Sequence, residues 1–105
     1  MDKKVRKVNA KLYLEYLQFK DEMLRKTQEE VFENCYKIDV FLNLYQIMVE
    51  KAQELSVEIL VQLEQDEHVL EKLYNGWMKI SDSTYEEMVR YVNEKLSAFG
   101  MKKAG

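Results

Sequence analysis

Few residues of this 105-residue chain have the types and spacing that catalysis or metal binding requires. His68 is the only histidine, and Glu64 precedes it by one helical turn, so the two side chains could share a metal ion. A di-iron helical bundle needs glutamate three residues before the histidine, and Gln65 occupies that position. We therefore predict no metal site.

Nucleophilic and phosphate-binding chemistry also lack a pattern. Cys35 is the only cysteine and lies on an apolar stripe, where cysteine is usually a small core residue. A single cysteine forms no disulfide within the chain and suits a reducing compartment. The three glycines stand alone, so no glycine-rich phosphate loop is present. We predict that the protein is not an enzyme and carries no cofactor.

The central element is predicted to be a helix between Ile38 and Val49, because nine of these twelve residues are apolar. A helix that is apolar on nearly every side is buried in a soluble protein. The chain is long enough for one core, so we expect an all-α fold with a single domain over residues 1–105 and about four helices around the central one. The residues expected in its middle are Phe41, Leu42, Leu44, Tyr45 and Met48.

Apolar residues at steps of three and four predict two long helices before residue 53. The first runs from about Val5 or Val8 to Leu24, with a buried stripe of Val5, Val8, Leu12, Tyr16, Phe19 and Met23. The next starts at Thr27, which has the capping-box spacing to Glu30. Its stripe is Val31, Cys35, Ile38, Leu42, Tyr45 and Val49.

The second half of the chain is also predicted to be helical. Ser56 is a plausible N-cap for a short helix over residues 57–63, and Asp66 could cap the following one. An apolar stripe from Val69 to Leu96 keeps its phase, which favours one continuous or gently kinked helix that ends at Gly100. The alternative is a new helix at the capping-box spacing of Ser83 and Glu86, and Gly76 weakens the continuous helix by about 1 kcal/mol.

Charge is unevenly distributed, although the net charge is only −3. Residues 29–71 carry eleven Asp or Glu and two Lys. Such a surface either keeps the protein soluble or steers it toward a basic protein partner. Aromatic and methionine side chains are enriched in interface centres, and Tyr13, Tyr36 and Tyr85 lie off the main stripes. The protein-binding surface that we predict comprises Glu58, Glu64, Glu67, Tyr74 and Met78.

The basic N-terminal helix gives an alternative function. Residues 1–11 carry five Lys or Arg and one Asp, and a nucleic-acid site there would use Lys3, Lys4, Arg6 and Lys7. A sequence pI near 5.3 makes nucleic acid the weaker alternative. The same helix carries Leu14 and Leu17 outside its main stripe, which predicts a homodimer through it.

Hydropathy predicts no association with a membrane. No run approaches the roughly 18 apolar residues that a membrane span needs, and the first twenty residues are not typical of a signal peptide. We expect a cytoplasmic protein.

Three stretches of the chain together form a recognisable pattern. They are the aromatic-rich segment 13–24, the run QEEVFENCY over residues 28–36, and the late pattern of Leu70, Leu73, Tyr74 and Trp77. This pattern resembles DUF 3848, an uncharacterised family of bacterial proteins. Gln28 stands where the family usually has proline. The resemblance covers residues 13–96 and implies a protein encoded on mobile genetic elements of gut bacteria. It makes an inhibitor of a host protein, similar in role to anti-CRISPR proteins, conceivable. We expect a non-catalytic helical interaction module.

Overall fold

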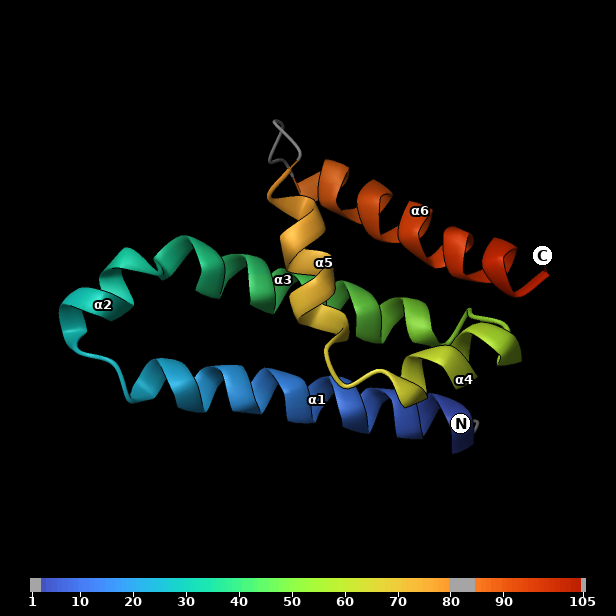
Figure 1. The fold of residues 1–105 in the computed structure, drawn as a ribbon, viewed down its shortest axis with the longest axis horizontal. Helices are drawn as coiled ribbons and strands as arrows, with labels where there is room; N and C mark the ends of the chain where they lie inside the picture. The colour runs from blue at the N-terminus through green and yellow to red at the C-terminus, as the bar shows by residue number, and fades with distance from the viewer. Residues whose placement is uncertain (1–2, 80–84, 105) are drawn as a thin grey trace.

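Six helices make up the part of the chain that the computed structural model describes, which is residues 3–79 and 85–104, without the side chains of 85 and 99–104 (Figure 1). They are α1 (Lys3–Leu24), α2 (Gln28–Glu33), α3 (Cys35–Ala52), α4 (Val57–Gln65), α5 (Val69–Trp77) and α6 (Tyr85–Ala104). The predicted all-α class is confirmed, with six helices in these ranges instead of about four.

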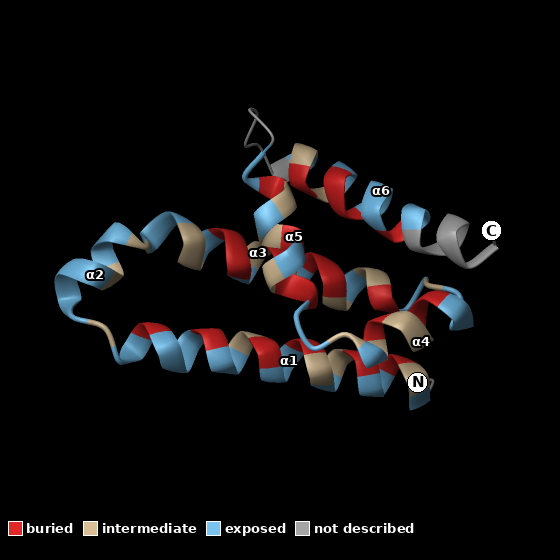
Figure 2. Ribbon diagram, in the orientation of Figure 1, coloured by how far each residue is buried: buried red, intermediate tan, exposed pale blue. Residues whose placement is uncertain are grey.

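Helices α1 and α3 lie side by side and run in opposite directions, with α2 joining them at one end (Figure 1). Helix α4 packs beside the first part of α1, α5 crosses α3 and α1, and α6 returns over α4 and α3. Two ring contacts show which residues of α1 and α3 lie opposite each other along the helix axes. Phe19 stacks on Phe41 with ring centroids 4.0 Å apart, and Tyr16 stacks on Tyr45 with centroids 5.0 Å apart. Figure 2 shows the buried residues gathered where these helices meet.

The stripe predicted for the first helix is confirmed. Val5, Val8, Leu12, Phe19 and Met23 are buried, and Tyr16 is half-buried against the core. One polar side chain, Glu15, is buried in the same stripe with 8% of its surface exposed. The sequence pattern did not indicate that this glutamate would be buried.

The central helix α3 buries a different side from the one that the sequence pattern predicted. Its buried residues are Val40, Phe41, Leu44, Ile47, Met48 and Ala52. Phe41, Leu44 and Met48 are confirmed as core, but the predictions for Leu42 and Cys35 are wrong, because Leu42 is 36% exposed and Cys35 is exposed. Tyr45 is only partly buried. Helices α5 and α6 cover the side of α3 that carries Leu44, and the two neighbouring apolar stripes cannot both face them.

Two helix starts were predicted correctly. The side chain of Thr27 accepts from the backbone N–H of Glu30 at 3.2 Å, and the Glu30 carboxylate accepts from that of Thr27 at 3.0 Å. Ser56 caps α4 by accepting from the N–H of Ile59. The helix that begins at Thr27 is interrupted at Asn34, whose ψ of 11° departs from helical values and separates α2 from α3.

The predicted single helix from Val69 onward is wrong. Helix α5 ends at Trp77 and α6 begins at Tyr85, so that α6 packs back onto α5, α3 and α4. Residues 80–84, which include Ile80, Ser83 and Thr84 of the predicted stripe and alternative cap, lie outside the described residues. The predicted helix end at Gly100 is also wrong, because α6 continues to Ala104. A glycine ends a helix through a positive φ, and no glycine in the described ranges has one.

Gly76 is required by the close packing of α6 on α5. The hydroxyl of Tyr91 donates to the backbone carbonyl of Leu73 at 2.7 Å, and the Tyr91 ring lies 5.8 Å from that of the buried Trp77. A Cβ atom at position 76 would overlap the Tyr91 hydroxyl. The glycine therefore permits a contact between two helices, at the cost of helix propensity within α5.

We predict that Gly76→Ala destabilises the protein by about 1–3 kcal/mol, although alanine normally favours a helix, because of this overlap. In a Tyr91→Phe background, which lacks the hydroxyl, the same substitution should cost clearly less. Urea unfolding of the four proteins in this double-mutant cycle measures the coupling. Equal costs in both backgrounds would show that Tyr91 does not limit the space at Gly76.

A second prediction compares two leucines of α3 that differ in burial. Leu44→Ala should lower the free energy of unfolding by about 2–5 kcal/mol, since the side chain is fully buried. Leu42→Ala should cost less than about 1 kcal/mol in the monomer, because that side chain is partly exposed. Thermal or urea unfolding measures both, and a larger cost at Leu42 would contradict the arrangement of the core.

Candidate functional site

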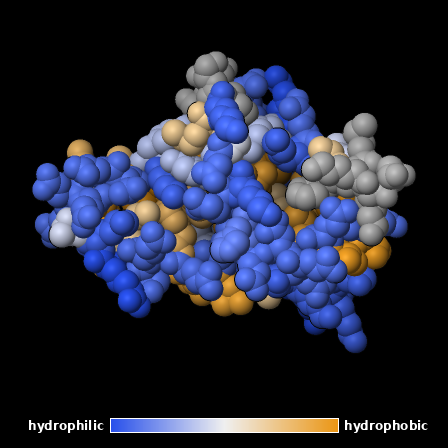
Figure 3. Space-filling view, viewed as in Figure 1, coloured by the Kyte–Doolittle hydropathy of each residue, from blue (hydrophilic) through white to orange (hydrophobic). Residues whose placement is uncertain are grey.

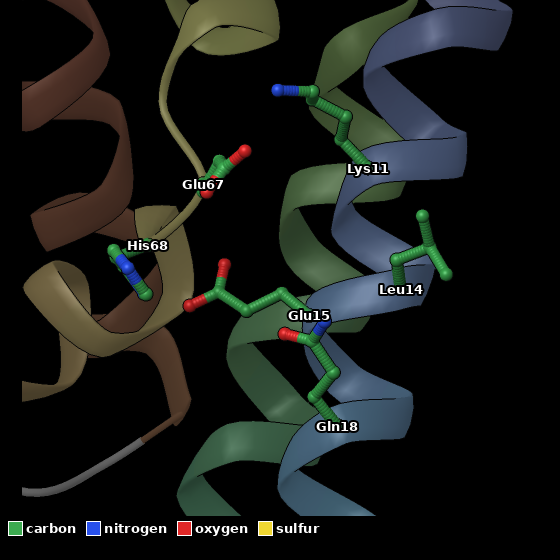
Figure 4. A pocket seen from close by; sticks show the side chains of 6 residues that line it. All are labelled: Lys11, Leu14, Glu15, Gln18, Glu67 and His68. Carbon is green, nitrogen blue, oxygen red and sulfur yellow. The ribbon is translucent and has the colours of Figure 1, made fainter.

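Glu15 of α1 caps the start of α5 across 55 residues of sequence. Its Oε1 accepts from the backbone N–H of Leu70 at 2.7 Å, and its Oε2 accepts from that of Glu71 at 2.9 Å. His68 occupies the N-cap position and makes no side-chain capping bond. Figure 4 shows the Glu15 carboxylate reaching from α1 toward the backbone beside His68. The first free amides of α5 are thus satisfied by a different helix.

Asp66 does not cap α5 in the way that the sequence suggested. Its Oδ1 accepts from the backbone N–H of His68 at 2.9 Å, and its Oδ2 accepts from the Lys72 ammonium at 2.9 Å. Although partial burial raises the Asp66 pKa, these bonds and the lysine charge hold the pKa below its usual value. Asp66 therefore shapes the connection between α4 and α5, and Glu15 is the cap.

Burial raises the pKa of Glu15, and the two backbone N–H bonds and the nearby His68 only partly offset this effect. The carboxylate lies at a pocket of about 150 Å³, whose lining residues are Lys11, Leu14, Glu15, Gln18, Glu67 and His68. Both carboxylate oxygens already accept bonds from the backbone, so this arrangement acts as a structural cap. Within residues 3–79 and 85–104, no three His, Cys, Asp or Glu residues come together as a metal site.

The predicted acidic residues occupy different surroundings. Glu58 is exposed in the first turn of α4, and Glu67 is exposed in the connection to α5. Glu64 lies 3.9 Å from the Lys7 ammonium, on the side of α4 that meets α1. Glu58 and Glu64 are six residues apart, about 240° around the helix, so they do not share one side of α4. The structure therefore places Glu58 and Glu64 on different sides of α4.

The two other residues of the predicted binding surface lie one turn apart at the end of α5. Tyr74 is half-buried: its ring packs on Phe41, and the Lys37 ammonium lies 4.9 Å from its centroid. Met78 is 50% exposed. Nearby, the Tyr36 hydroxyl accepts a hydrogen bond from Trp77 Nε1 at 3.2 Å. Tyr74 and Tyr36 thus contribute to packing, and the Met78 side chain is the more available of the two predicted binding residues at the end of α5.

The basic start of α1 lies beside acidic α4. Lys3 and Arg6 are exposed, and Lys7 contacts Glu64. Lys4 is half-buried and takes part in an interaction of its own. The cationic and anionic segments that are separate in the sequence are therefore partly neighbours in space, which weakens the positive field available to a nucleic acid.

An apolar surface lies along the long helix pair, and the sequence pattern singled out only Tyr13 and Leu17 of it as candidates for surface contacts. We call it the α1/α3 face, and it consists of Tyr13, Tyr16, Leu17 and Leu24 of α1 with Ile38, Leu42, Tyr45 and Val49 of α3. All eight are at least partly exposed, from half-buried Tyr16, Ile38, Tyr45 and Val49 to Leu24 at 73%. The contacts of Tyr13 and Tyr16 with Tyr45 join the two helices within this face.

The α1/α3 face points away from α5. Tyr13 and Leu17 each stand two residues from Glu15, about 200° around α1 from the side chain that caps α5. Figure 3 shows the side that α5 crosses, where hydrophilic side chains dominate and hydrophobic ones form smaller separate areas, several of them in hollows between the hydrophilic side chains. Near the α2 end, the face continues into an apolar groove of about 190 Å³ between Phe19, Lys20, Leu24 and Ile38.

The sequence contained a signal for this face. The stripe predicted for the second helix included Ile38, Leu42, Tyr45 and Val49, and it was assigned to the core. In the structure the same stripe borders α1 and remains partly exposed. A helix with two adjacent apolar stripes can bury one within its own chain and present the other.

Comparisons with protein-family models, curated proteins and solved structures gave no match to this chain. The resemblance to DUF 3848 therefore stays a prediction. None of the helices in the described ranges combines the length and apolar character that a membrane crossing requires.

We predict that Glu15→Ala lowers the free energy of unfolding by about 1–3 kcal/mol, because two amides at the start of α5 lose their acceptor. Glu15→Gln should cost less, since its side-chain oxygen can still accept one of these bonds. Urea unfolding at neutral pH measures both. Equal stability of wild type and Glu15→Ala would contradict a capping role.

The pH dependence of the same variants follows from the raised pKa of Glu15. The folded protein then binds this proton more readily than the unfolded chain, so protonation adds stability. That stability is full below the ordinary glutamate pKa of 4.5 and is lost as pH rises through the higher pKa of the folded protein. The stability advantage of wild type over Glu15→Gln should therefore grow as pH falls through this window. An advantage that shrinks would show that the two backbone bonds outweigh burial.

Proposed function

We propose that this protein is a non-catalytic helical interaction module that binds another protein chain through the α1/α3 face. The observation that carries the proposal is the exposure of Leu17 and Leu42, each 36% exposed, beside tyrosines on two adjacent helices. Contiguous apolar surface of this kind is costly in water and commonly marks a protein contact. Tyrosine suits such a contact, because it offers apolar area together with a hydroxyl that tolerates water.

The placement of the charged residues supports protein binding over the nucleic-acid alternative. Lys7 lies beside Glu64, and the net charge is −3, so a phosphate backbone would meet acidic side chains close to the basic ones. The acidic residues Glu58 and Glu67, both exposed, are expected to speed association with a basic partner and not to form the contact centre. An inhibitor of a host protein, encoded by a mobile element, is the form of such a module that the DUF 3848 resemblance suggests.

We predict that Leu17→Glu combined with Leu42→Glu abolishes capture of the partner by the immobilised protein, because two charges would enter the contact. Quantitative mass spectrometry of captured proteins measures the loss. Leu14→Glu is the matched control: Leu14 is 57% exposed on the same helix but lines the pocket near His68. Circular dichroism and thermal unfolding establish that all variants keep the fold.

A partner that is retained by the double variant at the wild-type level would overturn the assignment of the binding face. Reversal of the charges at Glu58, Glu64 and Glu67 distinguishes steering from contact. Such a triple variant should bind a basic partner more slowly at low salt and at nearly the wild-type rate at high salt, where long-range attraction is screened.

A further inference from the structure

The α1/α3 face has the residue spacing of a helical-bundle seam. On α3 the stripe residues Ile38, Leu42, Tyr45 and Val49 follow one another at steps of four, three and four. On α1 the positions 13, 17, 20 and 24 repeat the same steps, with Lys20 as the one charged member. This alternation places side chains of one helix between those of a facing helix. The face therefore fits an occupant made of two antiparallel helices.

A second copy of this chain supplies such a pair at matching levels. The stacking of Phe19 on Phe41 sets the level of α1 against α3, and each step forward along α1 is a step back along α3. Lys20 is therefore nearly level with Asp39, and Leu17 is nearly level with Leu42. A twofold axis parallel to the helices would lay each α1 over the α3 of the second copy at the same level, so that leucine meets leucine and lysine meets aspartate.

Charged residues within and beside the face favour this arrangement over its alternative. Lys20 and Arg6 on α1 are exposed, as are Asp39 and Glu50 on α3, and none of the four takes part in an ion pair within the described residues. Placing α1 over α3 of the second copy sets the helix that carries Lys20 and Arg6 against the helix that carries Asp39 and Glu50. A twofold axis perpendicular to the helices would instead set each helix, and so each charge, against its own kind.

We propose that the α1/α3 face is a self-association surface, through which two copies form an antiparallel four-helix interface with α1 of each copy on α3 of the other. This inference rests on the proposed function and assigns a second copy of the chain to the same face. Since that copy has a net charge of −3, the steering expected from Glu58 and Glu67 applies to a basic partner and has no part in this pairing. The interface pairs Leu17 with Leu42 and Lys20 with Asp39, each pair occurring twice by symmetry.

A charge-swap experiment tests the pairing. Lys20→Glu would place glutamate opposite Asp39 twice in a homodimer, and Asp39→Lys would place lysine opposite Lys20 twice. Each variant should raise the dissociation constant of its homodimer by about tenfold. A mixture of the two variants contains only opposite-charge pairs in its heterodimer. Native mass spectrometry, which separates the three dimers by mass, should therefore show the heterodimer in large excess over the statistical half.

Two further variants serve as controls, with sedimentation velocity as the measurement. Lys79→Glu changes the net charge as Lys20→Glu does, but at an exposed site after α5, and it should dimerise like wild type. Leu17→Glu should weaken the dimer by about a hundredfold or more. Leu14, which the sequence pattern also assigned to a dimer, lines the pocket near His68, so that Leu14→Glu should leave the dimer intact. Circular dichroism checks the fold of each variant.

Several results would overturn the proposal: a wild-type monomer at high micromolar concentration, a dimer that Leu17→Glu leaves intact, or a statistical mixture of the charge-swapped dimers. Failure here is distinguishable from failure of the proposed function. If wild type is monomeric but the Leu17→Glu and Leu42→Glu double variant still loses capture of another protein, the face binds proteins and the second copy is not its occupant. If capture also persists, both inferences fail.

Discussion

The arrangement of the second half of the molecule depends on one carboxylate. Glu15 accepts from the backbone N–H groups of Leu70 and Glu71, and so ties the start of α5 to the middle of α1. Helix α5 carries Leu70, which is fully buried, and Trp77 into the core, and α6 docks on α5 through Tyr91. The direction in which α5 crosses the long helices thus determines where α6 can pack. Burial opposes the charge on Glu15, and the hydrogen bonds at the helix start offset only part of this penalty.

The long helices are used on two sides. Leu44 and Met48 of α3 are buried in the core, on which α5 and α6 pack. Leu42 and Val49 stay partly exposed in the α1/α3 face, together with Tyr13 and Leu17 of α1. Burying both sides within 105 residues would require another helix, because one layer can cover only one side of a helix pair. The apolar residues left over form the α1/α3 face. Glu15 and Asp66 hold the connection between α4 and α5 and the start of α5 in place, and the contact function that we propose for the α1/α3 face would depend on this scaffold.

Some features of the fold were predictable from local sequence, and others were not. The capping residues Thr27 and Ser56 were found because their hydrogen bonds span three residues. The break between α5 and α6 was predicted only as the alternative, since the apolar stripe keeps its helical phase across it. The packing of Tyr91 on Gly76 and Trp77, which shows that α6 folds back, is a tertiary contact. Glu15 was missed as a cap because the backbone N–H groups that it accepts from, those of Leu70 and Glu71, lie 55 and 56 residues away in the sequence.

By itself the sequence determined the all-helical class, the first helix with its buried stripe, and the residues with the strongest local capping signals. Helical period and hydrogen bonds within one turn are local, so they can be read without knowing what packs where. Only the tertiary structure decided which of the two apolar stripes of α3 is buried, because that choice depends on the positions of α5 and α6. It also decided that the basic start of α1 lies against acidic Glu64. Periodicity identifies a face that needs a partner, and the fold decides whether that partner belongs to the same chain.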